Sequence, residues 1–375
     1  MNKNFFLFAA MPNRALLFIL FFSCSLFAQK SDGDSSFLDI NYFYGSILRH
    51  NKDISHLIKG HPDGLIVSYN RQTFGDKRWQ QAYNYPDWGF SFIYHNPHNS
   101  VLGENYGLHG HYNFYFFKRS LLFRAGSGIS YISNPFDLES NFKNNAYGSR
   151  LLNSTYFLIN YNKKNIFKGF GIQAGLTFIH YSNANVKAPN SSTNTLAFNI
   201  GVQYELDQKT NAKIFKKDSY EKYKEPIKFN LMLRGGINES DYLGLGQQPF
   251  GVVSTYLDKR LSFLSSIQVG TEVFFAKFLE KQIEYLSVAF PNNGVDGDAD
   301  TTRVGIFVGH ELHINKIAFL TQIGYYAYYP SDYEGRVYFR TGLNYYFHKN
   351  IFGAVTLKSH GAKAEAVEFG IGIRI

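Results

Sequence analysis

Cysteine is almost missing from this chain of 375 residues, which holds a single one, Cys24, inside an apolar N-terminal segment. One thiol cannot form an intrachain disulfide, so a disulfide framework is excluded. Long apolar runs are also missing: after the N-terminal segment, no stretch approaches the roughly 18 consecutive apolar residues that a membrane-spanning helix needs. The sequence therefore excludes a disulfide-stapled domain and a helical membrane protein.

The N-terminus has the features of an export signal. Lys3 and Arg14 supply positive charge, Ala15–Phe22 is a short apolar core, and Ala28 precedes a plausible cleavage point at Gln29. We therefore expect residues 1–28 to be a signal peptide. Its removal takes away Cys24, so the exported chain offers no cysteine nucleophile.

The charge is basic but dispersed. The 38 Lys and Arg residues outnumber 29 Asp and Glu, for a formal net charge of +9. These residues lie in turns and loops and form no single tract, and nothing resembles a nucleic-acid-binding element. Either they are solvated turn residues or they give the surface an affinity for an anionic partner, such as a phosphorylated glycolipid.

Strict alternation of apolar and polar residues dominates the rest of the chain. One face of residues 170–178 is apolar, whereas the opposite face holds Gly, Gln and Thr, and residues 196–205, 337–345 and 367–375 repeat the pattern. Aromatic residues make up 18% of the chain, enough for girdles at both membrane interfaces. This pattern predicts an all-β fold, an antiparallel transmembrane β-barrel with lipid outside and a polar lumen.

About sixteen strands are expected, an even number as in bacterial single-chain barrels. They lie near 38–48, 63–71, 88–95, 104–117, 119–132, 150–161, 167–182, 195–206, 227–237, 248–258, 261–277, 303–313, 316–329, 335–347, 350–359 and 366–375.

A polar connection, residues 207–225, divides these strands into residues 29–206 and residues 226–375. The alternation shared by both halves favours one large barrel, and the alternative is an eight-stranded barrel followed by a second β unit. Long loops at 133–149, 183–194 and 278–302 are expected on the extracellular side. Residues 72–87 break this rule, because they are long where a tight periplasmic turn is expected.

His180 and Ser182 stand at the end of an alternating segment. Residues two apart in a strand share a face, and both continue the apolar, lipid-facing side. A general base beside a hydroxyl is the pairing that activates a serine nucleophile. On a membrane surface, this pair suggests an esterase that acts on lipids in place.

The segment His180-Tyr181-Ser182-Asn183-Ala184, with Pro189-Asn190 beyond it, resembles the signature of the outer-membrane lipid A 3-O-deacylase family, also known as acyloxyacyl hydrolases. The likeness is to the longer members found in Bacteroidetes-type bacteria. It implies a barrel in the bacterial outer membrane that removes an ester-linked 3-hydroxyacyl chain from lipid A, at a site on the outer wall. Lipid A or lipopolysaccharide in the outer leaflet would then be the partner.

The resemblance also implies roles for single residues. Ser182 would be the nucleophile and His180 its general base. Asn190 matches the asparagine that stabilises the oxyanion, and Asn183 would assist it. The glutamate that orients the histidine in the family falls at Asn194, and this departure removes the charge that would stabilise an imidazolium. No cofactor and no metal is implied.

Other polar clusters are weaker candidates. His109 and His111 share a strand face at a metal-ligand-like spacing without a third ligand nearby, which favours lumen or interface residues. Asp296, Asp298 and Asp300 alternate with glycines but complete no calcium loop, which favours a solvated loop. The alternative functions are a porin-like or structural barrel without catalysis and a hydrolase of another membrane lipid ester.

Overall fold

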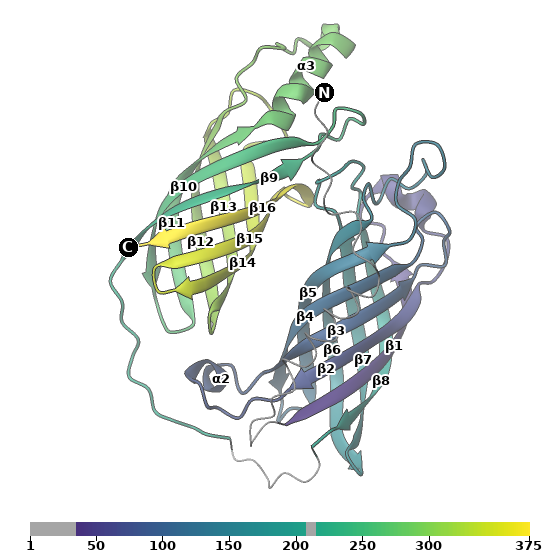
Figure 1. Cartoon of the computed structure of the whole chain (residues 1–375), viewed down its shortest axis with the longest axis vertical. Helices are drawn as coiled ribbons and strands as arrows, with labels where there is room; N and C mark the ends of the chain where they lie inside the picture. The colour runs from purple at the N-terminus through teal and green to yellow at the C-terminus, as the bar shows by residue number, and fades with distance from the viewer. Residues whose placement is uncertain (1–34, 208–214) are drawn as a thin grey trace, which may run out of the picture.

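The computed structural model describes residues 35–207 and 215–375, which fold into two closed antiparallel barrels of eight strands each (Figure 1). The expected signal peptide, with Cys24, lies outside the described residues. The first barrel consists of β1 (Ser36–Ile47), β2 (Asp63–Arg71), β3 (Asp87–Asn96), β4 (Asn105–Phe116), β5 (Leu121–Ile132), β6 (Leu151–Phe167), β7 (Phe170–Ser182) and β8 (Thr193–Glu205). The second consists of β9 (Lys228–Asn238), β10 (Gln248–Arg260), β11 (Ser265–Ala276), β12 (Arg303–Ile314), β13 (Ile317–Tyr328), β14 (Val337–His348), β15 (Ile351–His360) and β16 (Lys363–Arg374).

The sixteen antiparallel strands confirm the predicted fold class, but they do not close into the single large barrel that the shared alternation favoured. β1 pairs with β8, and β16 pairs with β9, so each half of the chain closes on itself. The arrangement is the alternative one, an eight-stranded barrel followed by a second β unit, and that unit is itself a barrel. Alternation sets which face a strand buries, and it is identical in barrels of eight and sixteen strands.

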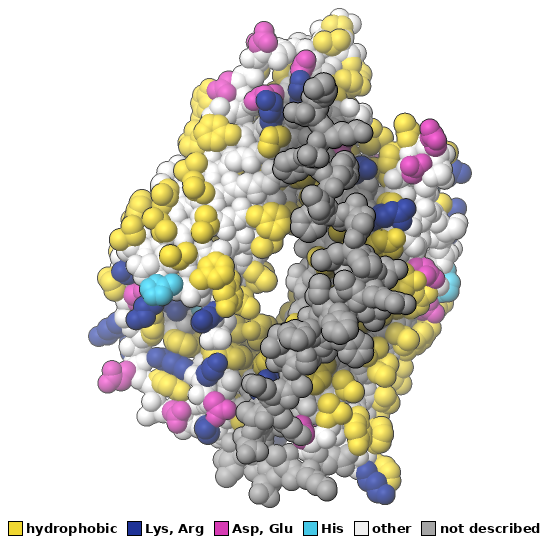
Figure 2. Space-filling model, viewed as in Figure 1, with side chains coloured by type: hydrophobic (Ala, Val, Ile, Leu, Met, Phe, Trp, Pro, Cys, Tyr) yellow, Lys and Arg dark blue, Asp and Glu magenta, His cyan; other side chains and the backbone are white. Residues whose placement is uncertain are grey.

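The apolar faces of the strands point outward and the polar faces point inward. Phe198 and Ile200 on β8 are 77% and 66% exposed on the outer wall, whereas Asn199 between them is buried in the lumen. Figure 2 shows hydrophobic side chains over the walls of both barrels. This is the distribution of a barrel that meets lipid outside and keeps polar groups within.

Buried ion pairs occupy both lumens. In the first barrel, Arg124 bonds Asp39 at 2.6 Å. In the second, Arg340 bonds both Glu272, at 2.9 Å, and Glu368, at 2.6 Å. An eight-stranded barrel has an interior just wide enough for side chains to fill it, and these pairs show that filling.

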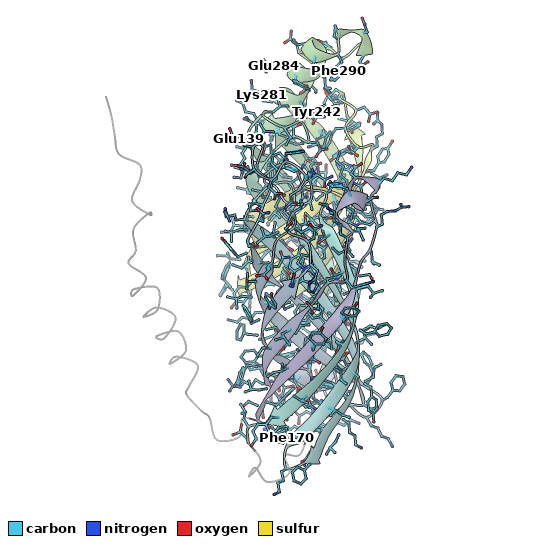
Figure 3. All side chains as sticks on the ribbon, turned by 90° about the vertical axis from the view of Figure 1, so that its right-hand side faces the viewer. Glu139, Phe170, Tyr242, Lys281, Glu284 and Phe290 are labelled. Carbon is cyan, nitrogen blue, oxygen red and sulfur yellow. The ribbon has the colours of Figure 1, made fainter. Side chains whose placement is uncertain are left out.

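The long loops of both barrels lie at the same end. Glu139 of the first barrel and Tyr242 and Phe290 of the second lie at the top of Figure 3, and Phe170 lies at the bottom. Helices η1 (Lys52–Leu57), α3 (Lys277–Ala289) and η2 (Pro291–Asn293) belong to the long loops, and α2 (Arg78–Ala82) lies at the opposite end. Within the described ranges, no helix has the length and apolarity needed to cross a membrane.

The loop of residues 72–87 is long because it contacts the connection between the barrels and the second barrel itself. Arg78 donates to the carbonyl of Glu221 at 3.1 Å and lies 4.7 Å from the ring centroid of Tyr220. The hydroxyl of Tyr83 donates to the carbonyl of His313 in the second barrel at 2.9 Å. A tight turn at this position would leave the connection without these contacts.

Candidate active site

The pairing of β7 with β8 sets the geometry around His180. In the register of these strands, His180 lies directly opposite Asn194. Their side chains meet on the outer wall, with Nδ1 of His180 2.6 Å from Oδ1 of Asn194. Because an amide oxygen only accepts, this contact places the proton of a neutral imidazole on Nδ1 and leaves Nε2 as the basic atom.

Ser182 is the last residue of β7, and its hydroxyl is held by the loop that follows, residues 183–192. Its Oγ donates to Oδ1 of Asn190 at 3.0 Å and accepts from the backbone N–H of Ala184 at 2.9 Å. The residue is 5% exposed, because the loop folds over the strand end.

Asn190 joins the loop to the nucleophile candidate. Its Oδ1 accepts from both the Ser182 hydroxyl and the backbone N–H of Asn183, each at 3.0 Å. Since a backbone N–H only donates, the amide must present its oxygen there. The Nδ2 group of Asn190 makes no hydrogen bond within the described residues, so it is available as a donor.

Both polar side-chain atoms of Asn183 form hydrogen bonds within the loop 183–192. Its Nδ2 donates to the carbonyl of Lys187 at 2.5 Å, and its Oδ1 accepts from the N–H of Asn185 at 3.0 Å. Ala184 and Asn185 have φ angles of 51° and 64°, in the left-handed region, which costs free energy for a residue with a Cβ and is common at functional sites.

His180 and Ser182 lie on the same face but are not hydrogen-bonded to each other in the described structure, since the serine proton points to Asn190. Rotation about the Cα–Cβ bond of Ser182 moves the hydroxyl between staggered positions. In unliganded enzymes, catalytic hydrogen bonds are often long and tighten only when the substrate binds. In the described structure, His180 is therefore bonded to Asn194 and Ser182 to Asn190, on the same face of β7.

Two residues on β6 lie beside the site, and the sequence did not indicate them as site residues. Asn153 lies opposite Ser182, and Thr155 lies opposite His180. Both face outward, so they border the site on the side away from β8. The only sequence signal for them is the strand register, which follows from the barrel and not from any motif.

The loop 48–62 after β1 also reaches the site. Nε2 of His50 lies 3.1 Å from the carbonyl oxygen of Ser191 and 3.2 Å from Oγ of Ser192. The contact joins residues more than 140 positions apart, which local sequence patterns cannot indicate.

The weaker candidates lie elsewhere. His109 and His111 face the lumen of the first barrel, where they bond Ser154 and Ser91, each at 2.8 Å. Asp296 and Asp300 accept from backbone N–H groups of their own loop. Among the described residues, no three His, Cys, Asp or Glu side chains are grouped to hold a metal ion.

An apolar hollow of about 340 Å³ lies on the outer wall of the first barrel, lined by residues such as Ala174 and Ile200. Ala174 precedes Ser182 by eight strand residues, roughly 26 Å at 3.3 Å per residue. The hollow is therefore separate from the site.

Known proteins resemble both halves of the chain. Residues 63–203 match the family described as lipid A 3-O-deacylase (PagL), and residues 227–375 match the family described as acyloxyacyl hydrolase, C-terminal domain. No curated protein matches the chain.

Among solved structures, a crystal structure of the outer membrane enzyme PagL is 18% identical, covers 44% of this chain and 97% of its own, and has a TM-score of 0.27. A triple mutant of Rhodopseudomonas blastica porin is 9% identical, covers 92% of this chain and 99% of its own, and has a TM-score of 0.18.

The two family matches together span most of the chain, in agreement with the resemblance of its His180–Asn190 segment. A β-barrel of this family resides in the bacterial outer membrane and acts on esters. The chain belongs to the family of outer-membrane lipid A deacylases, with the C-terminal domain of the acyloxyacyl hydrolases as its second barrel.

Proposed function

We propose that this protein removes an ester-linked 3-hydroxyacyl chain from lipid A, with Ser182 as the nucleophile and His180 as its general base. The observation that supports it most is the outer-wall cluster in which Asn194 orients His180 and Asn190 holds Ser182. A lipid in the outer leaflet reaches this cluster without leaving the membrane, since His180 continues the lipid-facing side of β7.

In the proposed reaction, Nε2 of His180 takes the proton from Oγ of Ser182 as Oγ attacks the carbonyl carbon of the ester. The bond between that carbon and the sugar oxygen breaks, and His180 gives its proton to the leaving oxygen, which departs as the sugar hydroxyl. Water, activated by the same imidazole, then hydrolyses the acyl-serine and frees the 3-hydroxy fatty acid. General base catalysis of this kind contributes about 10²–10⁴-fold.

Negative charge develops on the carbonyl oxygen in each step. Nδ2 of Asn190 is the donor that we assign to it, because Oδ1 of the same amide stays bonded to the N–H of Asn183 when Ser182 rotates away. Removing one such donor costs on the order of 10²–10³-fold in rate.

The proposal also assigns a role to each segment of the chain. Residues 29–206 would be the catalytic unit, residues 207–225 a periplasmic connection, and residues 226–375 the second β unit. Residues 1–28 would direct export and be removed.

The test is mass spectrometry of lipid A after incubation with the purified, folded protein. The matched variants are Ser182→Ala and Ser130→Ala; the latter removes a buried hydroxyl that has no hydrogen-bond partner within the described residues. We expect the native protein and Ser130→Ala to release one 3-hydroxyacyl chain, and Ser182→Ala to release none. Release by Ser182→Ala would refute the serine mechanism, and the loss of a chain other than an ester-linked 3-hydroxyacyl chain would refute the proposed substrate bond.

The alternative of a pore without catalysis predicts ion conductance. The buried pairs of Arg124 with Asp39 and of Arg340 with Glu272 fill the two lumens, which favours the esterase. We expect no stepwise conductance in planar bilayers. A regular open channel together with intact lipid A would support the porin-like function instead.

A further inference from the structure

The second barrel contacts the loop that holds Ser182. The segment after β9, residues 239–247, lies at the same end as the loop 183–192, where the two barrels approach each other (Figure 1). The contact joins the unit with the catalytic candidates to a barrel that contributes none of them.

Four hydrogen bonds make this contact. The N–H of Glu239 donates to the carbonyl of Asn185 at 2.9 Å, and Nδ2 of Asn185 donates to the carbonyl of Glu239 at 3.1 Å. The N–H of Ala188 donates to Oε2 of Glu239 at 3.0 Å, and Nε2 of Gln247 donates to the carbonyl of Val186 at 2.8 Å. They cover residues 185–188, which connect Ser182 to Asn190.

Glu239 is the centre of the contact. It is 7% exposed, and within the part of the chain that the structure describes its carboxylate forms no ion pair with a Lys or Arg side chain. A buried carboxylate is costly unless it is hydrogen-bonded, and its bond goes to the N–H of Ala188. The side chain is thus placed to bind this loop.

The other side of the loop is fixed by the first barrel. The N–H groups of Ser191 and Ser192 donate to the carbonyls of Asn145 and Ala146, at 3.0 and 3.2 Å. Asn190 therefore lies between one anchor on its own barrel and another on the second barrel. If the hydrogen bonds to either barrel are lost, the Asn190 amide that we assign to the oxyanion is no longer held in place.

We propose that Glu239 is a positioning residue for the deacylation: through Ala188 it holds Asn190 where its amide meets the developing oxyanion. The inference rests on the proposed function and gives the second barrel a role in it. Because an oxyanion donor acts on the transition state, Glu239 should affect kcat and leave KM nearly unchanged.

The test compares Glu239→Ala, Glu239→Gln and the control Asp241→Ala in the full-length protein, with lipid A as the substrate. Glu239→Gln keeps an oxygen acceptor for the N–H of Ala188. Asp241 is acidic and on the same segment, but it pairs with Lys363 on β16 and not with the loop 183–192. Hydrogen–deuterium exchange of residues 183–190 reports the order of the loop in each variant.

We expect Glu239→Ala to lower kcat about tenfold with KM within twofold, a part of the 10²–10³-fold effect of a whole oxyanion donor. Exchange in residues 183–190 should become faster, while the strands exchange as in the native protein. Glu239→Gln should recover most of the rate, and Asp241→Ala should match the native protein. If Glu239→Ala does not fold, Gln247→Ala removes a second bond of the same contact and should lower kcat about threefold.

A folded Glu239→Ala that turns over at the native rate would overturn the proposal, as would an unchanged exchange rate in residues 183–190. If the native protein releases no acyl chain, the proposed function fails instead. The exchange measurement then decides alone whether Glu239 holds the loop.

Discussion

The resemblance to the deacylase family implies a glutamate at the position of Asn194, and replacing Asn194 with a carboxylate should accelerate the proposed reaction. In the structure, Oδ1 of Asn194 lies 2.6 Å from Nδ1 of His180. Asn194→Asp keeps the shape of the side chain and adds a full negative charge beside the imidazolium that forms when His180 takes the serine proton. The native amide offers only its dipole.

The magnitude follows from the distance and the exposure of the pair. Two unit charges about 4 Å apart attract by about 4 kcal/mol at an effective dielectric constant of about 20. His180 and Asn194 are both partly exposed, and solvent screening with the desolvation of the new carboxylate reduces this to about 2 kcal/mol. A barrier lower by that amount corresponds to a kcat roughly 30-fold higher.

A second effect of Asn194→Asp should also raise kcat, because it concerns the tautomer of His180. An amide can turn and present its NH₂ group to Nδ1, which favours the tautomer with the proton on Nε2, and that tautomer cannot act as the base. A carboxylate only accepts, so Asn194→Asp locks the productive tautomer. Asn194→Ala removes the partner altogether and should lower kcat about 10- to 100-fold.

The assay is steady-state release of the 3-hydroxy fatty acid from lipid A in mixed micelles, with folding verified by the heat-dependent mobility of the barrel in gels. Asn153→Asp is the matched control, because it adds the same charge on the outer wall opposite Ser182 without facing His180 in the strand register. We expect it to give no acceleration. A folded Asn194→Asp with a kcat at or below the native value would refute the assignment of Asn194 as the partner that orients the base.

Two further substitutions test the packing around the site and the lumen. A Cβ on Gly148 would lie 2.4 Å from the carbonyl oxygens of Lys187 and Ala188, so Gly148→Ala should displace the loop and lower kcat at least tenfold, with the urea midpoint of unfolding unchanged. Arg124→Met leaves Asp39 charged and unpaired in the lumen, so it should lower the free energy of unfolding by about 3–5 kcal/mol, measured by urea titration in detergent. A stable Arg124→Met variant, or a fully active Gly148→Ala variant, would contradict these two accounts.

The strands and the outward face of the site could be predicted from the sequence because each depends on local alternation. Residues such as Phe198 and Ile200 show which face meets lipid, and His180 and Ser182 continue that face. The position of Asn194 on the same wall follows from the same period. These features need no knowledge of contacts between distant residues.

The closure of the strands could not be predicted in this way, because the face pattern is the same for one barrel of sixteen strands and two of eight. The contacts of Glu239 and His50 with the loop 183–192 depend on that closure and have no motif. Helix α3 was missed inside an expected loop, although Phe278, Leu279 and Ile283 gather on one side of it and are buried. The length of the loop 72–87 could not be explained from the sequence, because it depends on the contacts of this loop with the connection between the barrels.

Covalent trapping of the nucleophile tests the central claim most directly. A long-chain alkyl phosphonate p-nitrophenyl ester is attacked at phosphorus, where an Oγ–P bond forms and p-nitrophenolate leaves. Tandem mass spectrometry of the digested protein should then find one adduct, on Ser182, with one equivalent of p-nitrophenolate released and deacylation of lipid A abolished. An adduct on another residue, or lipid A deacylation that continues in a Ser182→Ala variant, would contradict the assignment of Ser182 as the nucleophile.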